Sequence, residues 1–144
     1  MAIAAEAIAL VPLVELGLRC VEIERLVARF STIHRPRRAI DILRAARVVD
    51  AALDVYPAAT CLKKSLVLMR ILRRRGHEAT VHLGVQKSAD RFRAHAWVEC
   101  DGRVLLDAGI VDGYAPMGRL PQVARATIAS TNRAASSSDV TTAG

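Results

Sequence analysis

The segment from Cys61 to Arg75 constrains the fold most, because it predicts a helix that is apolar around most of its circumference. Thr60 before it is a favourable N-cap residue, and Gly76 after it is a favourable terminator. One side of this helix carries Cys61, Ser65, Leu68 and Leu72, and the opposite side carries Lys63, Arg70 and Arg74. We therefore expect the central, best-buried helix of the domain here, with the Cys61 thiol at its first turn on the buried side.

Helices precede this segment and strands follow it. Apolar residues recur at spacings of three and four from Leu13 to Phe30, which predicts one helix, and a second is expected from about Arg37 to Val55. After Gly76 the period changes to two and predicts strands at 80–86, 92–99 and 103–107, followed by an irregular segment over 109–121. The fold class is therefore α+β: N-terminal helices and the Cys61 helix packed on a small antiparallel sheet.

The chain length of 144 residues fits one domain. We expect that domain over residues 1–130, with a helical N-terminal part at 1–55, a core at 57–108, and a flexible tail at 131–144. The N-terminal apolar stretch is interrupted by Glu6, Pro12, Glu15 and Gly17, so we expect no membrane span.

The charge and the cysteines limit the partners and cofactors. The net charge of +7 favours anionic partners, but five aromatic residues and no RNA-binding motif argue against nucleic acid. Three cysteines without metal-type spacing argue against a disulfide framework and a zinc site, so no metal or cofactor is predicted. Reduced thiols suit the cytoplasm.

The helix from Cys61 to Arg75 carries six basic residues and no acidic one. The interpretation that we favour is a solvated face whose last turn complements the helix dipole. An acidic peptide or protein partner is the alternative.

The turn at Asp101-Gly102 decides which residues of the last two strands face each other. A two-residue turn pairs Cys100 with Arg103 and places His95 opposite Ala108. A three-residue turn pairs Glu99 with Arg103, Trp97 with Leu105, and His95 with Asp107. We favour the second, because it unites an opposite-charge pair with a histidine oriented by a carboxylate.

A thiol, an imidazole and a carboxylate then form a candidate triad of Cys61, His95 and Asp107. The backbone N–H groups and the dipole of a helix N-terminus stabilise a thiolate, and a neighbouring imidazole can protonate a leaving amine. Each residue taken alone has a structural explanation, since a lone cysteine in an apolar helix is commonly a small core residue.

Four segments resemble the leader peptidases of lasso-peptide biosynthesis, in the transglutaminase-like, papain-type cysteine protease superfamily. They are Cys61-Leu-Lys-Lys-Ser-Leu-Val-Leu, Leu72-Arg-Arg-Arg-Gly-His, Val81-His-Leu-Gly-Val, and Phe92-Arg-Ala-His-Ala-Trp-Val-Glu-Cys-Asp-Gly-Arg-Val. The resemblance covers about Ala46 to Asp107. It implies that Cys61, His95 and Asp107 are the catalytic residues.

The resemblance also implies a function and partners. The expected function is removal of the leader from a ribosomally made precursor peptide in the bacterial cytoplasm, before an asparagine-synthetase-like lasso cyclase closes the macrolactam. Residues 1–55 are predicted to be helical. We therefore expect the stand-alone form of the peptidase, and this form relies on a separate leader-recognition protein. Its candidate docking surfaces are the apolar face of Ala2–Leu10 and the basic face of the Cys61 helix. A transglutaminase-like acyl transferase and a non-catalytic basic binding module are the alternatives.

Overall fold

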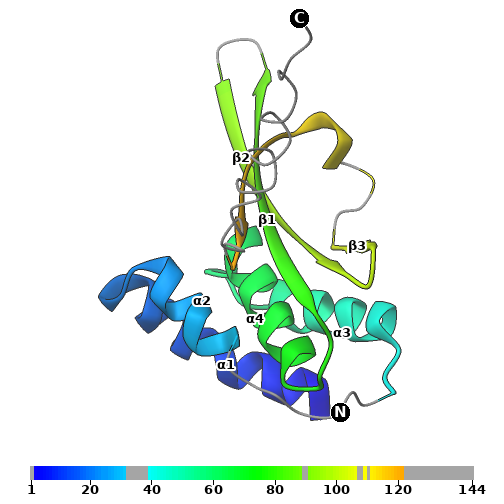
Figure 1. Ribbon diagram of the computed structural model, residues 1–144. Coiled ribbons are helices and arrows are strands. Elements are labelled where there is room, and N and C mark those ends of the chain that lie inside the picture. The colour runs from blue at the N-terminus through cyan, green and yellow to red at the C-terminus, as the bar shows by residue number, and fades with distance from the viewer. Residues whose placement is uncertain (1, 32–38, 89–90, 107–108, 110, 122–144) are drawn as a thin grey trace, which may run out of the picture.

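Figure 1 shows the computed structural model, which describes residues 2–31, 39–88, 91–106, 109 and 111–121. The helices are α1 (Ala2–Cys20), α2 (Ile23–Ser31), α3 (Ile42–Asp54) and α4 (Cys61–Arg73). The strands are β1 (Ala79–Ser88), β2 (Arg91–Cys100), β3 (Arg103–Leu105) and β4 (Ala115–Leu120), with a 3-10 turn at Val111–Gly113. They form an antiparallel sheet in the order β3-β2-β1-β4, and the helices pack together at one end of the long β1–β2 ribbon. The predicted α+β class is confirmed.

Helix α4 is the centre of the core, as predicted. Its side chains at Leu66, Val67, Leu68, Met69, Ile71 and Leu72 are fully buried. Thr60 caps its N-terminus by accepting a hydrogen bond from the Lys63 N–H, which confirms the predicted start. At its other end Gly76 adopts a positive φ of 79°, which a residue without a side chain adopts at little cost.

The predicted N-terminal helix is in fact two helices, separated at Val21 and Glu22. Gly17 allows close packing after this break, because a Cβ at this position would lie 2.6 Å from Leu26 Cδ1. Gly17 and Leu26 would be about 13 Å apart along one continuous helix. The missing side chain instead lets α2 turn back and pack Leu26 against α1. The second predicted helix is α3, which begins later than expected, after its N-cap Asp41.

The sheet differs from prediction at its two edges. Strand β3 ends at Leu105, and Leu106 has a positive φ of 65°. The segment expected to be irregular contains β4, which pairs with β1 and shifts register beside Gly84. Pro116 and Gly118 are typical of loops but are tolerated in an edge strand, where a missing N–H faces away from the sheet.

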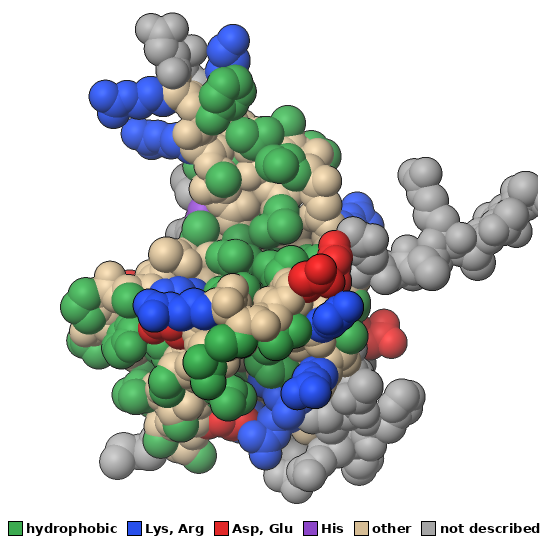
Figure 2. All heavy atoms as spheres, turned by 90° about the vertical axis from the view of Figure 1, so that its left-hand side faces the viewer, with side chains coloured by type: hydrophobic (Ala, Val, Ile, Leu, Met, Phe, Trp, Pro, Cys, Tyr) green, Lys and Arg blue, Asp and Glu red, His purple; other side chains and the backbone are tan. Residues whose placement is uncertain are grey.

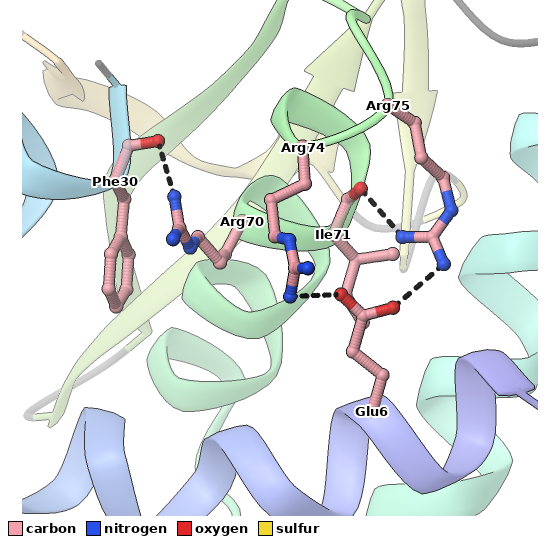
Figure 3. A network of polar contacts seen from close by, with 6 residues as sticks. All are labelled: Glu6, Phe30, Arg70, Ile71, Arg74 and Arg75. Carbon is pink, nitrogen blue, oxygen red and sulfur yellow. Dashed lines mark hydrogen bonds and ion pairs between the residues drawn. The ribbon is translucent and has the colours of Figure 1, made fainter. Parts of the chain in front are cut away.

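The basic residues of α4 are not a solvated face. Figure 3 shows Glu6 of α1 between two of them, accepting hydrogen bonds from Arg74 (3.1 Å) and Arg75 (2.7 Å). Arg70 donates to the backbone carbonyl of Phe30 and lies over its ring. Burial lowers the pKa of Arg70, Arg74 adds to this effect, and Glu6 opposes it. The expected solvated face is therefore wrong for this helix, whereas the expected complement to the helix dipole is present, since Arg75 donates to the Ile71 carbonyl at 3.0 Å.

The first turn of α4 is held in the same way. Lys64 binds Asp50 at 2.7 Å and also Asp54, both on α3. Burial alone would lower the pKa of Lys64, but these two carboxylates raise it above its ordinary value. Lys63 donates to the Ala58 carbonyl at 2.8 Å and lies 3.6 Å from Glu15 of α1. The cations of α4 thus attach it to the helices around it.

One face of α1 is both apolar and exposed. Ala7, Val11 and Val14 are buried, whereas Ile8, Leu13 and Leu16 are 53%, 55% and 60% exposed. Figure 2 shows hydrophobic side chains over much of one side of the molecule, both on its helical end and on the sheet. Within the described ranges, no helix is long and apolar enough to cross a membrane. The predicted tail at 131–144 lies outside the described residues.

We predict that Glu6→Gln lowers the free energy of unfolding by about 1–3 kcal/mol, because it leaves two half-buried guanidinium groups without their carboxylate. Urea denaturation followed by circular dichroism measures the change. Glu22→Gln is the matched control. It removes a carboxylate from an exposed ion pair with Arg25 and should cost less than about 0.5 kcal/mol. Equal losses in the two variants would contradict this account.

Candidate active site

Cys61 is the first residue of α4, directly after the Thr60 cap. Its side chain is half-buried and packs against the core. The first N–H groups of a helix have no carbonyl partner within it, so the N–H groups of Cys61 and Leu62 point out of this terminus. A negative charge is stabilised at such a position. The structure therefore places a thiol where a helix can stabilise its anion.

Ser65 connects the Cys61 side of α4 to the sheet. It lies one turn after Cys61 and is fully buried, and its hydroxyl donates to the Ala96 carbonyl of β2 at 3.1 Å. Residues four apart in a helix share a face, so Cys61 lies on the side of α4 that contacts β2. The helix that carries the thiol is thereby fixed against the residue next to His95.

His95 lies in a row of rings on the face of the sheet opposite the core. Ala96, Val98 and Cys100 of β2 point into the core, so His95 and Trp97 point the other way. The His95 ring lies 6.3 Å from the Trp97 ring and 5.3 Å from the Tyr114 ring, centroid to centroid. Trp97 therefore shares the face of His95.

Gly84 provides the space for this row of rings. It pairs with His95 across the β1–β2 ladder, and a Cβ there would lie 2.9 Å from the Trp97 ring and 3.0 Å from Tyr114 Cβ. Any side chain would therefore displace the aromatic rings beside His95. The structure brings Cys61 to β2 but gives its thiol no described contact with the His95 ring.

The predicted register of the β2–β3 turn is wrong. Cys100 pairs with Arg103 and Glu99 with Val104, so the turn has two residues, Asp101 and Gly102. Both have positive φ, 51° and 73°, as a type I′ turn requires, and Asp-Gly is among the sequences that adopt this turn most readily. The opposite-charge pair that favoured the longer turn does not form.

Asp107 lies outside the described residues. The two-residue turn removes the pairing that placed it opposite His95, and the positive φ of Leu106 interrupts the alternation of side chains along the strand. The role of Asp107 therefore rests on the sequence resemblance.

The sequence interpretation missed a different histidine–carboxylate pair. His82 Nε2 lies 3.0 Å from Glu99 Oε2, and the His82 ring stacks on Trp97 at 5.6 Å. Burial lowers the pKa of His82 and Arg119 adds to this effect, although Glu99 opposes it. The pair was detectable in principle, because His82 occupies an outward position of its predicted strand and Glu99 an outward position of the next.

Comparison with known proteins identifies the family. Residues 9–119 match the family model of the transglutaminase-like superfamily, a range that contains Cys61, His95 and Asp107. No curated protein and no solved structure matches the chain.

We predict that Trp97→Ala lowers the free energy of unfolding by about 3 kcal/mol or more, because the ring is only 8% exposed and packs between two histidines. Thermal and urea denaturation measure the loss. Phe92→Ala on the same strand is the matched control, since Phe92 is 73% exposed and its loss should be nearly neutral. A Trp97→Ala protein with unchanged melting temperature but weaker peptide binding would show that the ring lines a peptide groove.

Proposed function

The chain belongs to the transglutaminase-like superfamily, whose members are in general cysteine proteases or acyltransferases, and on that premise we propose that it is a cysteine peptidase. Its proposed substrate is the precursor of a lasso peptide, from which it removes the leader. The observation that carries the peptidase proposal is Cys61 at the capped N-terminus of the buried helix α4, fixed through Ser65 to the strand that bears His95.

The proposed reaction proceeds through a thioester. The Cys61 thiolate attacks the carbonyl carbon of the scissile bond, and His95 donates a proton to the leaving amine as the C–N bond breaks. Water then attacks the thioester, gives up a proton to His95, and releases the leader carboxylate and the thiol. The Cys61 N–H at the helix N-terminus can donate to the developing oxyanion. Asp107 is the proposed orienting carboxylate for His95.

This mechanism requires the His95 ring to come within about 3.5 Å of the Cys61 sulfur when substrate is bound. Because His95 points to the face of the sheet opposite the core, rotation of its side chain alone does not bring the ring to Cys61, and the backbone of β2 at His95 has to change as well. The rings of Trp97 and Tyr114, which lie beside His95, would then have to move. Substrate binding would therefore be coupled to assembly of the triad.

A separate leader-recognition protein is the proposed partner, with an asparagine-synthetase-like cyclase acting on the product. Ile8 of the expected Ala2–Leu10 surface is exposed, and the exposed apolar face continues along α1 to Leu13 and Leu16, which supports docking on this helix. The basic face of α4 was the second expected docking surface. It is less available to a partner, because Lys63, Arg70 and Arg74 already bind groups of this chain.

We predict that Cys61→Ser abolishes cleavage of a lasso precursor, lowering the rate by at least about a thousandfold, because the thioester cannot form. Mass spectrometry of the precursor measures the products, and Cys20→Ser is the matched control that should retain the wild-type rate. In the wild type, iodoacetamide should modify Cys61 faster than Cys20 although Cys20 is the more exposed.

The products separate the alternatives. A product joined to an added amine, instead of a free leader acid, would identify an acyltransferase. Cleavage that survives in Cys61→Ser would exclude Cys61 as the nucleophile. A folded wild type that binds the precursor without ever converting it, with the partner present, would identify a binding module.

We predict that the leader-recognition protein stimulates cleavage at least tenfold, because holding the leader raises the local concentration of the scissile bond. Leu16→Glu on the exposed face of α1 should reduce this stimulation. Met117→Glu, an equally exposed apolar position on β4, is the matched control and should leave it intact. Equal cleavage rates with and without the partner would contradict the stand-alone form.

A further inference from the structure

Three potential metal ligands meet at the end of α4 that lies away from Cys61. They are His77, Cys100 and Asp101, and one ligand atom from each lies within 4.8 Å of the other two. His77 follows α4, whereas Cys100 ends β2 and Asp101 begins the turn to β3. Metal motifs defined by the spacing between cysteines do not include this set, because only one of its three ligands is a cysteine.

The local backbone explains why these residues meet. Gly76 and His77 close α4 in a Schellman motif, with the His77 N–H bonded to the Leu72 carbonyl at 3.1 Å and the Gly76 N–H to that of Arg73 at 3.0 Å. Ala79 then pairs with Cys100, which brings His77 beside the β2–β3 turn. Asp101 follows Cys100 in the sequence and is the first residue of that turn.

The spacing of the donors suits a tetrahedral ion. Around Zn²⁺, with bonds of about 2.0–2.3 Å, neighbouring ligand atoms lie about 3.3–3.6 Å apart. His77 Nδ1 and Asp101 Oδ2 are already 3.4 Å apart. The greatest separation in the set, at most 4.8 Å, has to shorten by little more than about 1 Å, which side-chain rotation can supply.

The burial and the chemistry of the donors select the metal. His77 and Cys100 are 5% and 1% exposed, whereas the Asp101 side chain is 31% exposed and gives access from solvent. Thiolate sulfur and imidazole nitrogen favour Zn²⁺ over Mg²⁺ or Ca²⁺, which take oxygen ligands. A Cys100 thiolate and an Asp101 carboxylate together balance the two positive charges of the ion.

We propose that His77, Cys100 and Asp101 form a zinc site, with the Cys100 proton released to solvent on binding and water as the fourth ligand on the Asp101 side. The bound ion ties the end of α4 to the β2–β3 turn. Cys61 and His77 are separated by the whole of α4, a distance of about 20 Å or more. The site is therefore independent of the proposed peptidase chemistry.

Metal analysis of the untagged full-length protein tests this proposal. We expect about one zinc ion per folded chain after dialysis against zinc and then metal-free buffer. Replacement by Co²⁺ should produce tetrahedral visible bands and a thiolate-to-cobalt charge-transfer band in the near ultraviolet. Cys100→Ser should abolish the charge-transfer band, and the matched controls Cys20→Ser and Cys61→Ser should retain it.

Asp101→Asn keeps the proposal testable if Cys100→Ser fails to fold. Asn tolerates the left-handed backbone of position 101, so this variant should fold, and we expect its zinc affinity to fall at least tenfold. A folded wild type that retains no zinc and gives no charge-transfer band would overturn the proposal. Loss of the band in Cys61→Ser, or wild-type affinity in Asp101→Asn, would overturn it as well.

Discussion

The burial of α4 is the constraint on which the rest of the structure depends. A helix covered on nearly every side cannot leave its cations to solvent, and a half-buried charge without a partner destabilises the fold. The surrounding helices supply the partners: Glu6 from α1, the Phe30 carbonyl from α2, and two carboxylates from α3. The N-terminal helices therefore position the helix that carries Cys61, and they do so through charge as well as through apolar packing.

The parts of the fold that depend on local sequence were predictable. Thr60, the apolar periodicity and Gly76 define α4, and alternation defines β1 and β2, because caps and periods act within a few residues. The close packing of α2 on α1 was not predictable, since it depends on Leu26 meeting Gly17 after the chain turns back. Strand β4 was missed for a related reason: its Pro and Gly indicate a loop until a partner strand exists for it to pair with.

The candidate site also has a part that local sequence predicts and a part that it does not. The position of Cys61 follows from the Thr60 cap and from the helical periodicity of α4, so it was predictable from the sequence. The partner of a histidine across a sheet depends on register, and a change of one residue in one turn moves every pairing. Asp-Gly at positions 101–102 favours the type I′ turn that forms, and this local preference decides the register over the opposite-charge pairing of Glu99 with Arg103. The carboxylate of Glu99 instead contacts His82.

The two ends of α4 are attached to the sheet by different contacts. At its N-terminus, a nucleophile needs a fixed position relative to β2, which the Ser65–Ala96 hydrogen bond provides. At its C-terminus, the Schellman motif and the His77–Asp101 contact join the helix to the β2–β3 turn. Both attachments involve β2, so sliding of α4 along this strand would have to break contacts at both ends together. Any movement that assembles a catalytic pair therefore has to occur in the backbone of β2 at His95 and in the rings beside it, while the helix that carries Cys61 stays in place.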